Sequence, residues 1–435
     1  MQAVIMAGGK GTRLKAITGD EIPKPLAPIH GKPILQWQVE QLRENGILEI
    51  VLIVGYQGEK IKSFFGDGSA FGVSISYIEE IEPLGTAGAF YFLKHKLTSD
   101  TFFLIFGDVI FNIDLKKMAE YHERKHALAT LFVHPNTHPF DSDLVVCDGE
   151  GKISRFDSKH NDRSGYWYEN CVNAGFYMFH RKICDFVVAP KKTDLEKELL
   201  SSLVAEGQAV YAYRSPEYIK DVGTVERITV AEKEIQSGFV ASRNLKNPQK
   251  AIFLDRDGTI NRKNGLVYQE EQFELLPSVV EAIAKINRSG YLAIVVTNQP
   301  VVARGLCEIE EIESIHRKME TLFGREGVLL DDVKFCPHHP DKGYPEENPL
   351  YKVPCHCRKP DIGMLEEAAR QYHIDLASSW FVGDTTVDIK TGENARMRTA
   401  LVRTGDAGKD GKYQVTPTLV AENLLAAVEQ ILEVQ

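Results

Sequence analysis

The sequence has little cysteine, no long apolar run and no excess of positive charge. Its 435 residues include only 7 cysteines, too few for the disulfide framework of a small secreted protein. No stretch reaches the roughly 18 consecutive apolar residues of a membrane-spanning helix. The first seven residues carry no positive side chain and run into glycines, so we expect no signal peptide and a cytoplasmic location.

The charge balance is acidic, with 51 basic and 61 acidic residues and a formal net charge of −10. We therefore expect neither nucleic acid nor an anionic membrane as a partner. Small phosphorylated substrates remain compatible, because a few local cations and backbone amides suffice to hold a phosphate. The hydrophobic share of 43% excludes a mainly disordered chain, and the length predicts two or three domains.

The chain is predicted to form two α/β units, each opening with a short apolar strand that leads into a polar turn. The first strand precedes AGGKGTRL and the second precedes DRDGT, and α/β folds place their sites at such turns. We predict a first domain over residues 1–237, a linker over 238–249 and a second domain over 250–435. The linker is rich in glycine, asparagine and proline and has no hydrophobic period.

The two units differ in their expected sheets. In the first, strands outnumber helices after residue 128, which predicts a parallel half followed by a mixed sheet. In the second, strands alternate with helices, and the last helix is expected over 419–434. Alternation of this kind predicts a parallel sheet covered on both faces.

A glycine-rich run after the first strand indicates a phosphate-binding loop. Glycines let backbone N–H groups approach phosphate oxygens, and Arg13 adds a two-pronged donor. The run is neither a Walker A loop nor a dinucleotide loop. Lys24 lies between two prolines that stiffen its backbone. Asp108 and Asp221, each beside a glycine, are turn residues when taken singly, but together they could hold Mg²⁺.

These motifs carry a family resemblance. AGGKGTRL, PKPLAPI, LGTAGA, FGD, NAGFYMF and KDVGT follow in the order seen in sugar-1-phosphate nucleotidyltransferases, which residues 1–235 resemble. The resemblance implies a Rossmann-like domain with a mixed sheet that joins a nucleoside triphosphate to a sugar 1-phosphate and releases pyrophosphate. It departs at FDSKH, where many relatives carry Glu-Lys-Pro and where Lys159 would take the place of the lysine. The implied nucleotide contacts are Gly8, Gly9, Gly11, Thr12 and Arg13, with Lys24 on the reacting phosphates, Asp108 and Asp221 on Mg²⁺, Gly85, Thr86 and Gly88 by base and sugar, and Asn173 and Gly175 by the sugar.

The second polar turn places two carboxylates, Asp255 and Asp257, after an apolar strand. One can attack phosphorus while the other exchanges a proton with the leaving group and water. Downstream, Thr297 offers a hydroxyl and Lys359 a cation at strand ends. FVGDTTVD then supplies further acids.

Residues 250–435 resemble the haloacid dehalogenase-like phosphatases in this order of motifs. The resemblance implies a parallel α/β domain in which an aspartyl-phosphate forms and is hydrolysed, with Mg²⁺ reducing the repulsion between carboxylate and phosphate. The implied roles are Asp255 as nucleophile, Asp257 as general acid and base, Thr297 and Lys359 on the phosphoryl group, and Asp255, Asp384 and the Asp257 carbonyl on Mg²⁺, with Asp388 supporting the site. Asn298 is expected to bind substrate.

A cluster of cysteine and histidine precedes Lys359. Cys336, His338, Cys355 and Cys357 have the residue types of a tetrahedral zinc site, and four protein ligands would make it structural. The alternative is a set of free thiols, and His339 and His356 compete as ligands. The loop resembles that of the phosphatase subgroup that acts on heptose bisphosphate and histidinol phosphate, and Arg358 could contact a second phosphate.

Together the resemblances imply a bifunctional enzyme of nucleotide-activated heptose synthesis. The second domain would remove the 7-phosphate of D-glycero-D-manno-heptose 1,7-bisphosphate, and the first would transfer a nucleotidyl group, expected from GTP, to the heptose 1-phosphate. One alternative joins a histidinol-phosphate or other sugar-phosphate phosphatase to a mannose or glucose 1-phosphate nucleotidyltransferase. Another is a non-catalytic sensor or assembly module.

Overall fold

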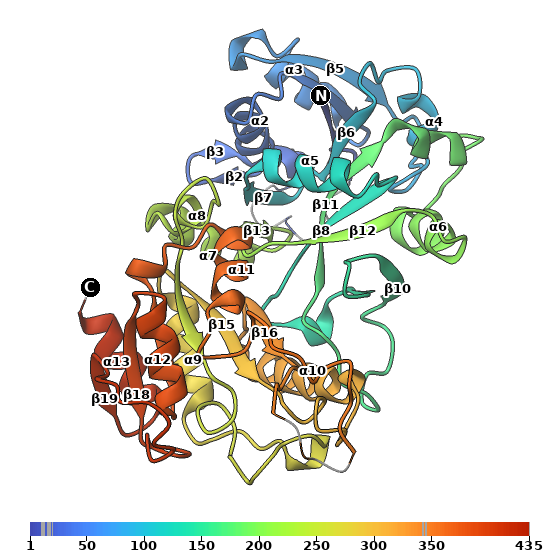
Figure 1. Cartoon of the computed structure of the whole chain (residues 1–435). Helices are drawn as coiled ribbons and strands as arrows, with labels where there is room; N and C mark the ends of the chain where they lie inside the picture. The colour runs from blue at the N-terminus through green and yellow to red at the C-terminus, as the bar shows by residue number, and fades with distance from the viewer. Residues whose placement is uncertain (10–13, 15–18, 20, 342, 344–345, 435) are drawn as a thin grey trace. The chain divides into compact units, whose positions relative to one another are not determined.

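The computed structural model describes residues 1–9, 14, 19, 21–341, 343 and 346–434 (Figure 1). The chain divides into two compact units. Unit 2 also takes up two short segments from the N-terminal half. Unit 1 comprises Met1–His134, Asp143–Ser158 and Cys171–Asn244, and unit 2 comprises Pro135–Ser142, Lys159–Asn170 and Leu245–Gln435.

Unit 1 is built on a nine-stranded mixed sheet, as predicted. Four strands are mutually parallel, in the order β6-β1-β4-β5, and β11 runs antiparallel beside β6. Strands β8, β9 and β10 continue the sheet in antiparallel pairs, and β12 lies parallel to β8. The strands are β1 (Gln2–Met6), β4 (Glu49–Val54), β5 (Ser74–Glu79), β6 (Thr101–Phe106), β8 (Ala129–His134), β9 (Leu144–Cys147), β10 (Ile153–Asp157), β11 (Val172–His180) and β12 (Val210–Arg214).

Alternating apolar side chains bury both faces of this sheet. Ala3 and Ile5 of β1 point into one core cluster and Val4 points into the other. One face carries α2 (Ile34–Glu44), α3 (Gly58–Phe65) and α5 (Leu115–Arg124). The other carries α4 (Phe90–Leu93), η5 (Arg181–Phe186), the π-helical turn η6 (Leu195–Leu200) and α6 (Ser201–Ala205).

Smaller elements complete unit 1. A two-stranded ribbon, which sequence reasoning did not predict, pairs β7 with β13. The helix α8 lies within the stretch 238–249. The remaining elements are η2 (Lys24–Leu26), β2 (Pro28–Ile29), β3 (Lys32–Pro33), η3 (Ser69–Phe71), β7 (Val109–Asn112), β13 (Tyr218–Asp221), α7 (Val225–Gln236) and α8 (Phe239–Ser242).

Unit 2 contains a six-stranded, wholly parallel sheet in the order β16-β15-β14-β17-β18-β19, as predicted. The first strand of the unit, β14, therefore lies inside the sheet. The strands are β14 (Lys250–Leu254), β15 (Tyr291–Asn298), β16 (Asp332–Cys336), β17 (Trp380–Gly383), β18 (Arg398–Val402) and β19 (Leu419–Ala421).

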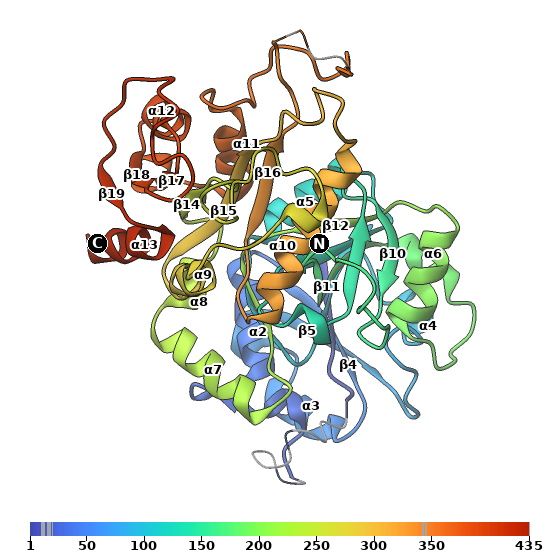
Figure 2. The ribbon, with the colours of Figure 1, turned by 90° about the horizontal axis from the view of Figure 1, so that it is seen from below.

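Helices cover both faces of the second sheet. One face carries α9 (Val279–Arg288), α10 (Ile309–Arg325) and α13 (Leu424–Glu433), with α9 and α13 side by side (Figures 1 and 2). The other carries α11 (Gly363–Tyr372) and α12 (Thr386–Asn394), which packs on Phe381 at Gly392. Short 3₁₀ turns are η4 (Pro139–Asp141), η7 (Glu270–Gln272) and η8 (Leu376–Ser378).

The helix predicted over 419–434 begins later than expected. Leu419–Ala421 forms the edge strand β19, paired with β18, and the helix begins at Leu424. Asn423 separates the two because its side-chain oxygen accepts from the Ala426 N–H at 3.0 Å and caps the helix. In the part of the chain that the structure describes, no helix is long and apolar enough to cross a bilayer.

Candidate active sites

A cavity of about 380 Å³ opens in unit 1 at the carboxyl ends of β1, β5 and β6. Parallel α/β sheets place ligands at this edge. Six of the residues predicted for nucleotide transfer line it, while Gly11, Thr12 and Arg13 lie outside the described residues. The lining residues are Met6, Gly8, Gly9, Lys24, Pro25, Glu80, Pro83, Gly85, Thr86, Phe106, Gly107 and Asp108.

Glycine is needed around this cavity because backbones approach closely. A Cβ on Gly8 would lie 3.1 Å from the Glu80 carboxylate. Gly85 has φ +75°, and a Cβ there would lie 2.5 Å from the Thr193 carbonyl oxygen. Gly88 is not among the described residues that line the cavity. A Cβ on Gly88 would lie 2.3 Å from the Lys191 carbonyl oxygen. The structure therefore gives Gly88 a packing role.

The two acids predicted for magnesium in unit 1 are brought together by strand pairing. Asp221 lies opposite Val109 in the β13–β7 ribbon, and the Val222 N–H donates to the Asp108 carbonyl at 2.8 Å. The Asp108 carboxylate pairs with Lys24, and the Asp221 carboxylate accepts from Arg227 at 2.6 Å. Each carboxylate thus faces a cation of the chain, and the two acids stay predicted Mg²⁺ ligands, since one or two carboxylates completed by substrate phosphates are the usual protein share of a Mg²⁺ shell.

Sequence reasoning missed one charged residue of the cavity. Glu80 follows β5 and lines the cavity, where burial raises the pKa of its carboxyl. Its Oε1 is buried, and none of the residues that the structure describes forms a hydrogen bond with it. No local signal marked it, since EEIEP resembles an ordinary solvated turn.

The residues predicted on the sugar side lie on a bulged part of β11. The Asn173 side-chain amide donates to Glu196 at 2.8 Å and to the Tyr177 hydroxyl at 3.1 Å. Burial raises the pKa of Glu196. Gly175 has φ +69°, and a Cβ on it would lie 2.9 Å from the Phe106 ring, which lines the cavity. Gly175 thus packs against a wall of the cavity.

In unit 2 the predicted nucleophile lies at the carboxyl end of β14. The Lys359 ammonium donates to Asp255 at 2.8 Å and to Asp388 at 2.6 Å, and all three side chains are buried. Burial alone would lower the pKa of Lys359, but the two carboxylates outweigh it and hold the pKa above its usual value. A buried, permanently charged lysine beside a carboxylate is suited to neutralising a bound phosphoryl group.

Three carboxylates converge beside this lysine. Oxygens of Asp255, Asp384 and Asp388 all lie within 4.8 Å of one another. Burial, with Asp388 adding repulsion, raises the pKa of Asp255 to about 6, and burial with Asp255 raises that of Asp384 to about 8.

The surroundings of Asp384 fit a divalent cation. Its Oδ1 is buried and has no hydrogen-bond partner in the described part of the chain. A Cβ on Gly258 or Gly405 would come within 2.4 or 2.1 Å of its carboxylate, so only backbone fits there. A hard cation such as Mg²⁺ would engage the orphaned oxygen and offset the crowded negative charge.

The Asp257 carboxylate points to a different set of partners. Arg256 donates to both of its oxygens at 3.0 Å, and Asn261 donates at 3.0 Å. The Gln299 amide donates to Asp257 at 2.9 Å and to the Thr297 hydroxyl at 3.0 Å. Sequence reasoning missed Arg256 and Gln299, although both directly adjoin predicted motifs.

Asn298 holds the backbone of Lys359. Its side chain accepts from the Lys359 N–H and donates to the Lys359 carbonyl, both at 3.0 Å. Arg358 donates to the His338 carbonyl at 3.0 Å. The loop that carries the cysteines is therefore fixed to the residues that enter the site.

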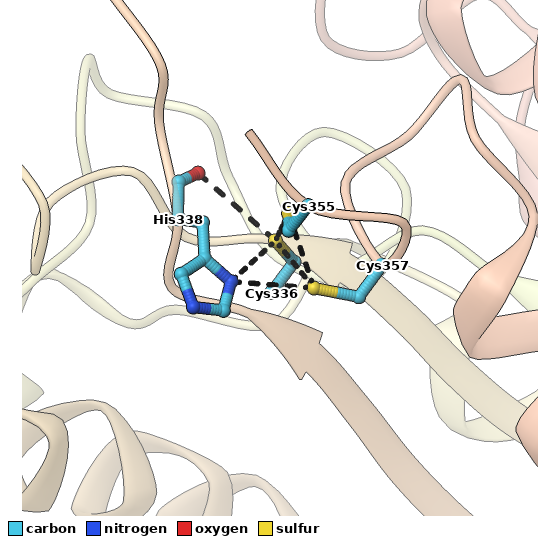
Figure 3. A group of neighbouring side chains, drawn as sticks. All are labelled: Cys336, His338, Cys355 and Cys357. Carbon is cyan, nitrogen blue, oxygen red and sulfur yellow. Dashed lines mark hydrogen bonds between the residues drawn. The ribbon is translucent and has the colours of Figure 1, made fainter. Parts of the chain in front are cut away.

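Cys336, His338, Cys355 and Cys357 form a compact cluster (Figure 3). The three sulfurs lie 3.1 to 3.5 Å apart, and His338 Nδ1 lies 3.3 Å from the Cys357 sulfur. Sulfurs around a tetrahedral zinc would be separated by about 3.8 Å, so a small expansion would admit the ion. Hydrogen bonds from the other two thiols and from His338 lower the pKa of Cys357 to about 5, although burial opposes this shift.

The competing histidines point elsewhere. His339 accepts from the Asp341 N–H at 3.1 Å, and His356 pairs with Glu366 at 2.9 Å. The donor set of three sulfurs and one imidazole nitrogen suits zinc and leaves no position for a substrate. Of the other cysteines, Cys171, Cys184 and Cys307 are buried.

The acid cluster predicts how stability depends on pH and magnesium. Without a cation, raised folded-state pKa values mean that the folded protein holds more protons than the unfolded chain between about pH 4 and pH 8, so stability falls as the pH rises through this window. Added Mg²⁺ should therefore raise the melting temperature more at pH 8 than at pH 5. Thermal unfolding with and without Mg²⁺ checks this. The increase should be much smaller in Asp384→Asn, and an equal Mg²⁺ effect at both pH values would contradict it.

Comparisons with known proteins match the two parts of the chain to two families. Residues 2–238 match the nucleotidyl transferase family, and residues 356–427 match the HAD-hydrolase-like family. A D-glycero-β-D-manno-heptose-1,7-bisphosphate 7-phosphatase from Photorhabdus laumondii is 41% identical over 156 residues, covering 36% of this chain and 81% of its own.

Two further relatives match the N-terminal part. A D-glycero-α-D-manno-heptose 1-phosphate guanylyltransferase from Aneurinibacillus thermoaerophilus is 34% identical over 236 residues, covering 54% of this chain and 99% of its own. A mannose-1-phosphate guanylyltransferase from Mycobacterium tuberculosis is 32% identical over 247 residues, covering 57% of this chain and 67% of its own. With its N-terminal cavity and its C-terminal aspartate site, the chain belongs to the nucleotidyl transferase family in its first half and to the HAD-like phosphatases in its second.

Proposed function

We propose that this chain is a bifunctional enzyme that removes the 7-phosphate of D-glycero-D-manno-heptose 1,7-bisphosphate and then transfers GMP from GTP to the heptose 1-phosphate. One observation carries the proposal. A single chain holds an assembled phosphatase site and a nucleotide-transfer cavity, and relatives of its two parts are named for heptose phosphates at consecutive steps.

In the phosphatase half, the Asp255 carboxylate attacks the 7-phosphorus and the bond to the sugar oxygen breaks. The departing oxygen takes a proton from Asp257, which must first receive one and turn away from Arg256. Asp257 then deprotonates a water that attacks the aspartyl-phosphate, releasing phosphate and restoring Asp255. Lys359 and Thr297 hold the phosphoryl oxygens. Mg²⁺ held by Asp255, Asp384 and the Asp257 carbonyl would reduce the repulsion between the anions.

In the transferase half, an oxygen of the sugar 1-phosphate attacks the α-phosphorus of GTP and pyrophosphate leaves. No covalent bond to the protein forms, so alignment and charge neutralisation supply the catalysis. We assign the backbone of Gly8 and Gly9 to the triphosphate and Lys24, with Arg13, to the reacting phosphates. Mg²⁺ at Asp108 and Asp221 would neutralise the pyrophosphate.

The two steps must share one anomer. Hydrolysis at C7 leaves C1 untouched, yet the phosphatase relative is named for the β anomer and the transferase relative for the α anomer. We therefore propose that the phosphatase site of this chain accepts the α-bisphosphate.

The proposal is tested by incubating the full chain with either anomer of heptose 1,7-bisphosphate, Mg²⁺ and each nucleoside triphosphate in turn. We expect phosphate, pyrophosphate and GDP-heptose from the α anomer with GTP. Absence of both phosphate release and nucleotide-sugar with every triphosphate would contradict it. Parallel reactions with histidinol phosphate and with mannose 1-phosphate test the alternative pairing.

Glu80 supports guanine as the base. A carboxylate beside a triphosphate site repels the phosphates, but it can accept the N1–H and 2-amino protons of guanine together, and no described residue forms a hydrogen bond with its Oε1. Adenine carries no proton on N1 and uracil has no amino group, so neither offers this pair of donors.

The variant Glu80→Gln tests this assignment. Discrimination by a two-pronged pair is worth about 1–3 kcal/mol, so kcat/KM for GTP should fall about ten- to a hundredfold while that for the other triphosphates changes little. The exposed neighbour Glu82 provides the matched control, Glu82→Gln. An equal loss with all four triphosphates would remove Glu80 from base recognition.

We propose further that residues 1–237 and 250–435 carry the two activities, joined by 238–249, and that the zinc is structural. We propose a cytoplasmic location for the enzyme, because the proposed substrates are charged metabolites and the cysteine cluster needs reducing conditions. Neither nucleic acid nor membrane is proposed as a partner.

A further inference from the structure

Two segments of the N-terminal half, Pro135–Ser142 and Lys159–Asn170, belong to unit 2. We call them the clasp. They connect β8 to β9 and β10 to β11, strands of the transferase sheet, yet they pack on α10 of the phosphatase half. Two strands of one sheet can be connected without packing on a helix of another unit. The packing of these connections on α10 therefore suggests that it has a function.

The two segments of the clasp are bonded to each other. The Asn136 N–H donates to the Asn170 side chain at 3.0 Å, and the Asn170 amide donates back to the Asn136 carbonyl at 2.7 Å. Arg163 donates to the carbonyls of Pro139 and Ser142 at 2.8 and 2.9 Å. The clasp is therefore one folded element.

Side chains of helix α10 form hydrogen bonds with backbone groups of the clasp. The Tyr168 N–H donates to the Thr321 hydroxyl, which donates to the Tyr168 carbonyl, both at 3.0 Å. Glu320 accepts from the Asn170 N–H at 3.3 Å. Thr321 and Asn170 are almost fully buried, so these bonds replace water completely.

The close approach also needs a glycine in the helix. A Cβ on Gly324 would lie 2.4 Å from the Pro139 ring. Trp167 donates to Glu270 at 2.8 Å, and Lys318 and Arg325 lie 5.5 and 5.4 Å from its ring centroid. The surface of α10 therefore matches the clasp in shape, in hydrogen bonds and in charge.

We propose that Thr321 and Glu320, which belong to the phosphatase half, are positioning residues for nucleotidyl transfer. Asn170 lies three residues before Asn173, and β11 begins at Val172. By holding Asn170, the two side chains fix the point from which β11 starts and so the placement of Asn173 on the sugar side. The inference rests on the proposed transferase function.

The variant Thr321→Val in the full chain tests the proposal. Valine keeps the shape but removes the two buried hydrogen bonds that the Thr321 hydroxyl makes with the Tyr168 N–H and carbonyl. We expect KM for the sugar 1-phosphate to rise about tenfold, with KM for GTP and the rate of phosphate release within about twofold of the unaltered chain. Thr321→Ser restores a hydroxyl and should return KM to near its original value.

A second variant approaches the same contact through shape. Alanine normally stabilises a helix relative to glycine, so Gly324→Ala should harm transfer only because it displaces Pro139. Gly290→Ala is the control, because a Cβ there meets nothing within 4 Å. Hydrogen exchange of residues 171–176 should be about tenfold faster in Thr321→Val and Gly324→Ala than in the control.

Unchanged exchange at 171–176, or an equal fall of both activities, would overturn the proposal. If the unaltered chain transfers no nucleotide, the proposed function fails, and the exchange measurement still decides whether the clasp holds the start of β11.

Discussion

Replacing Asp255 with asparagine is expected to abolish phosphate release and to leave nucleotidyl transfer intact. A carboxamide is too weak a nucleophile to attack phosphorus, and loss of a nucleophile typically lowers kcat by about 10⁴-fold or more. Because burial and Asp388 already disfavour the charge on Asp255, the neutral amide should not destabilise the metal-free protein. Phosphate release from the bisphosphate and transfer to heptose 1-phosphate are measured on the same full-length preparation.

The matched control is Asp361→Asn, an exposed aspartate two residues after Lys359. It should leave both activities within about twofold, because surface substitutions of this kind rarely change stability by more than about 0.5 kcal/mol. Phosphate release that survives in Asp255→Asn would exclude this residue as the nucleophile. Loss of transfer in that variant would show that the two activities depend on one another.

The second large effect is expected at the cysteine cluster. Cys357→Ser should reduce zinc from about one ion per chain to near none and destabilise unit 2 by about 3 kcal/mol, since zinc binding in small zinc domains contributes about 10–16 kcal/mol over four ligands. Cys357 directly precedes Arg358 and Lys359, so phosphate release should fall at least about tenfold. Metal analysis, thermal unfolding and phosphate release are the three measurements.

Cys147→Ser provides the control, because this half-exposed cysteine lies on β9 in unit 1 and is not a member of the cluster. It should keep its zinc and its phosphatase activity. A folded, fully active chain that contains no zinc would refute a structural metal here. A variant Cys357→Ser with normal zinc content would remove this sulfur from the ligand set.

Much of unit 2 was predictable because its chemistry lies at strand ends. Asp255 and Thr297 each follow an apolar run, and the carboxyl ends of parallel strands meet at one edge. Local sequence therefore implied that distant residues come together. His338 was predicted as the fourth member of the cysteine cluster with His339 and His356 as competitors, and the structure places His338 beside the sulfurs while the other two rings bond elsewhere.

Other features escaped because their meaning comes from partners far along the chain. The Glu80 carboxyl has a raised pKa because it is buried beside Gly8, and the Asp257 carboxylate is oriented by hydrogen bonds from Arg256 and Gln299. The edge strand β19 exists because β18 offers it unpaired backbone groups, whereas its three residues alone continue the helical pattern of α13.

The sequence by itself determined the two α/β units, the order of their motifs and the residue types of both sites. These follow from hydrophobic periodicity and from side-chain chemistry, which are properties of short segments. Only the tertiary structure decided that two segments of the first half fold onto α10, because that depends on buried groups such as Thr321 finding partners about 150 residues away. A buried polar group must find a partner within the protein, whereas an exposed one can bond to water. No local sequence pattern shows which groups will be buried.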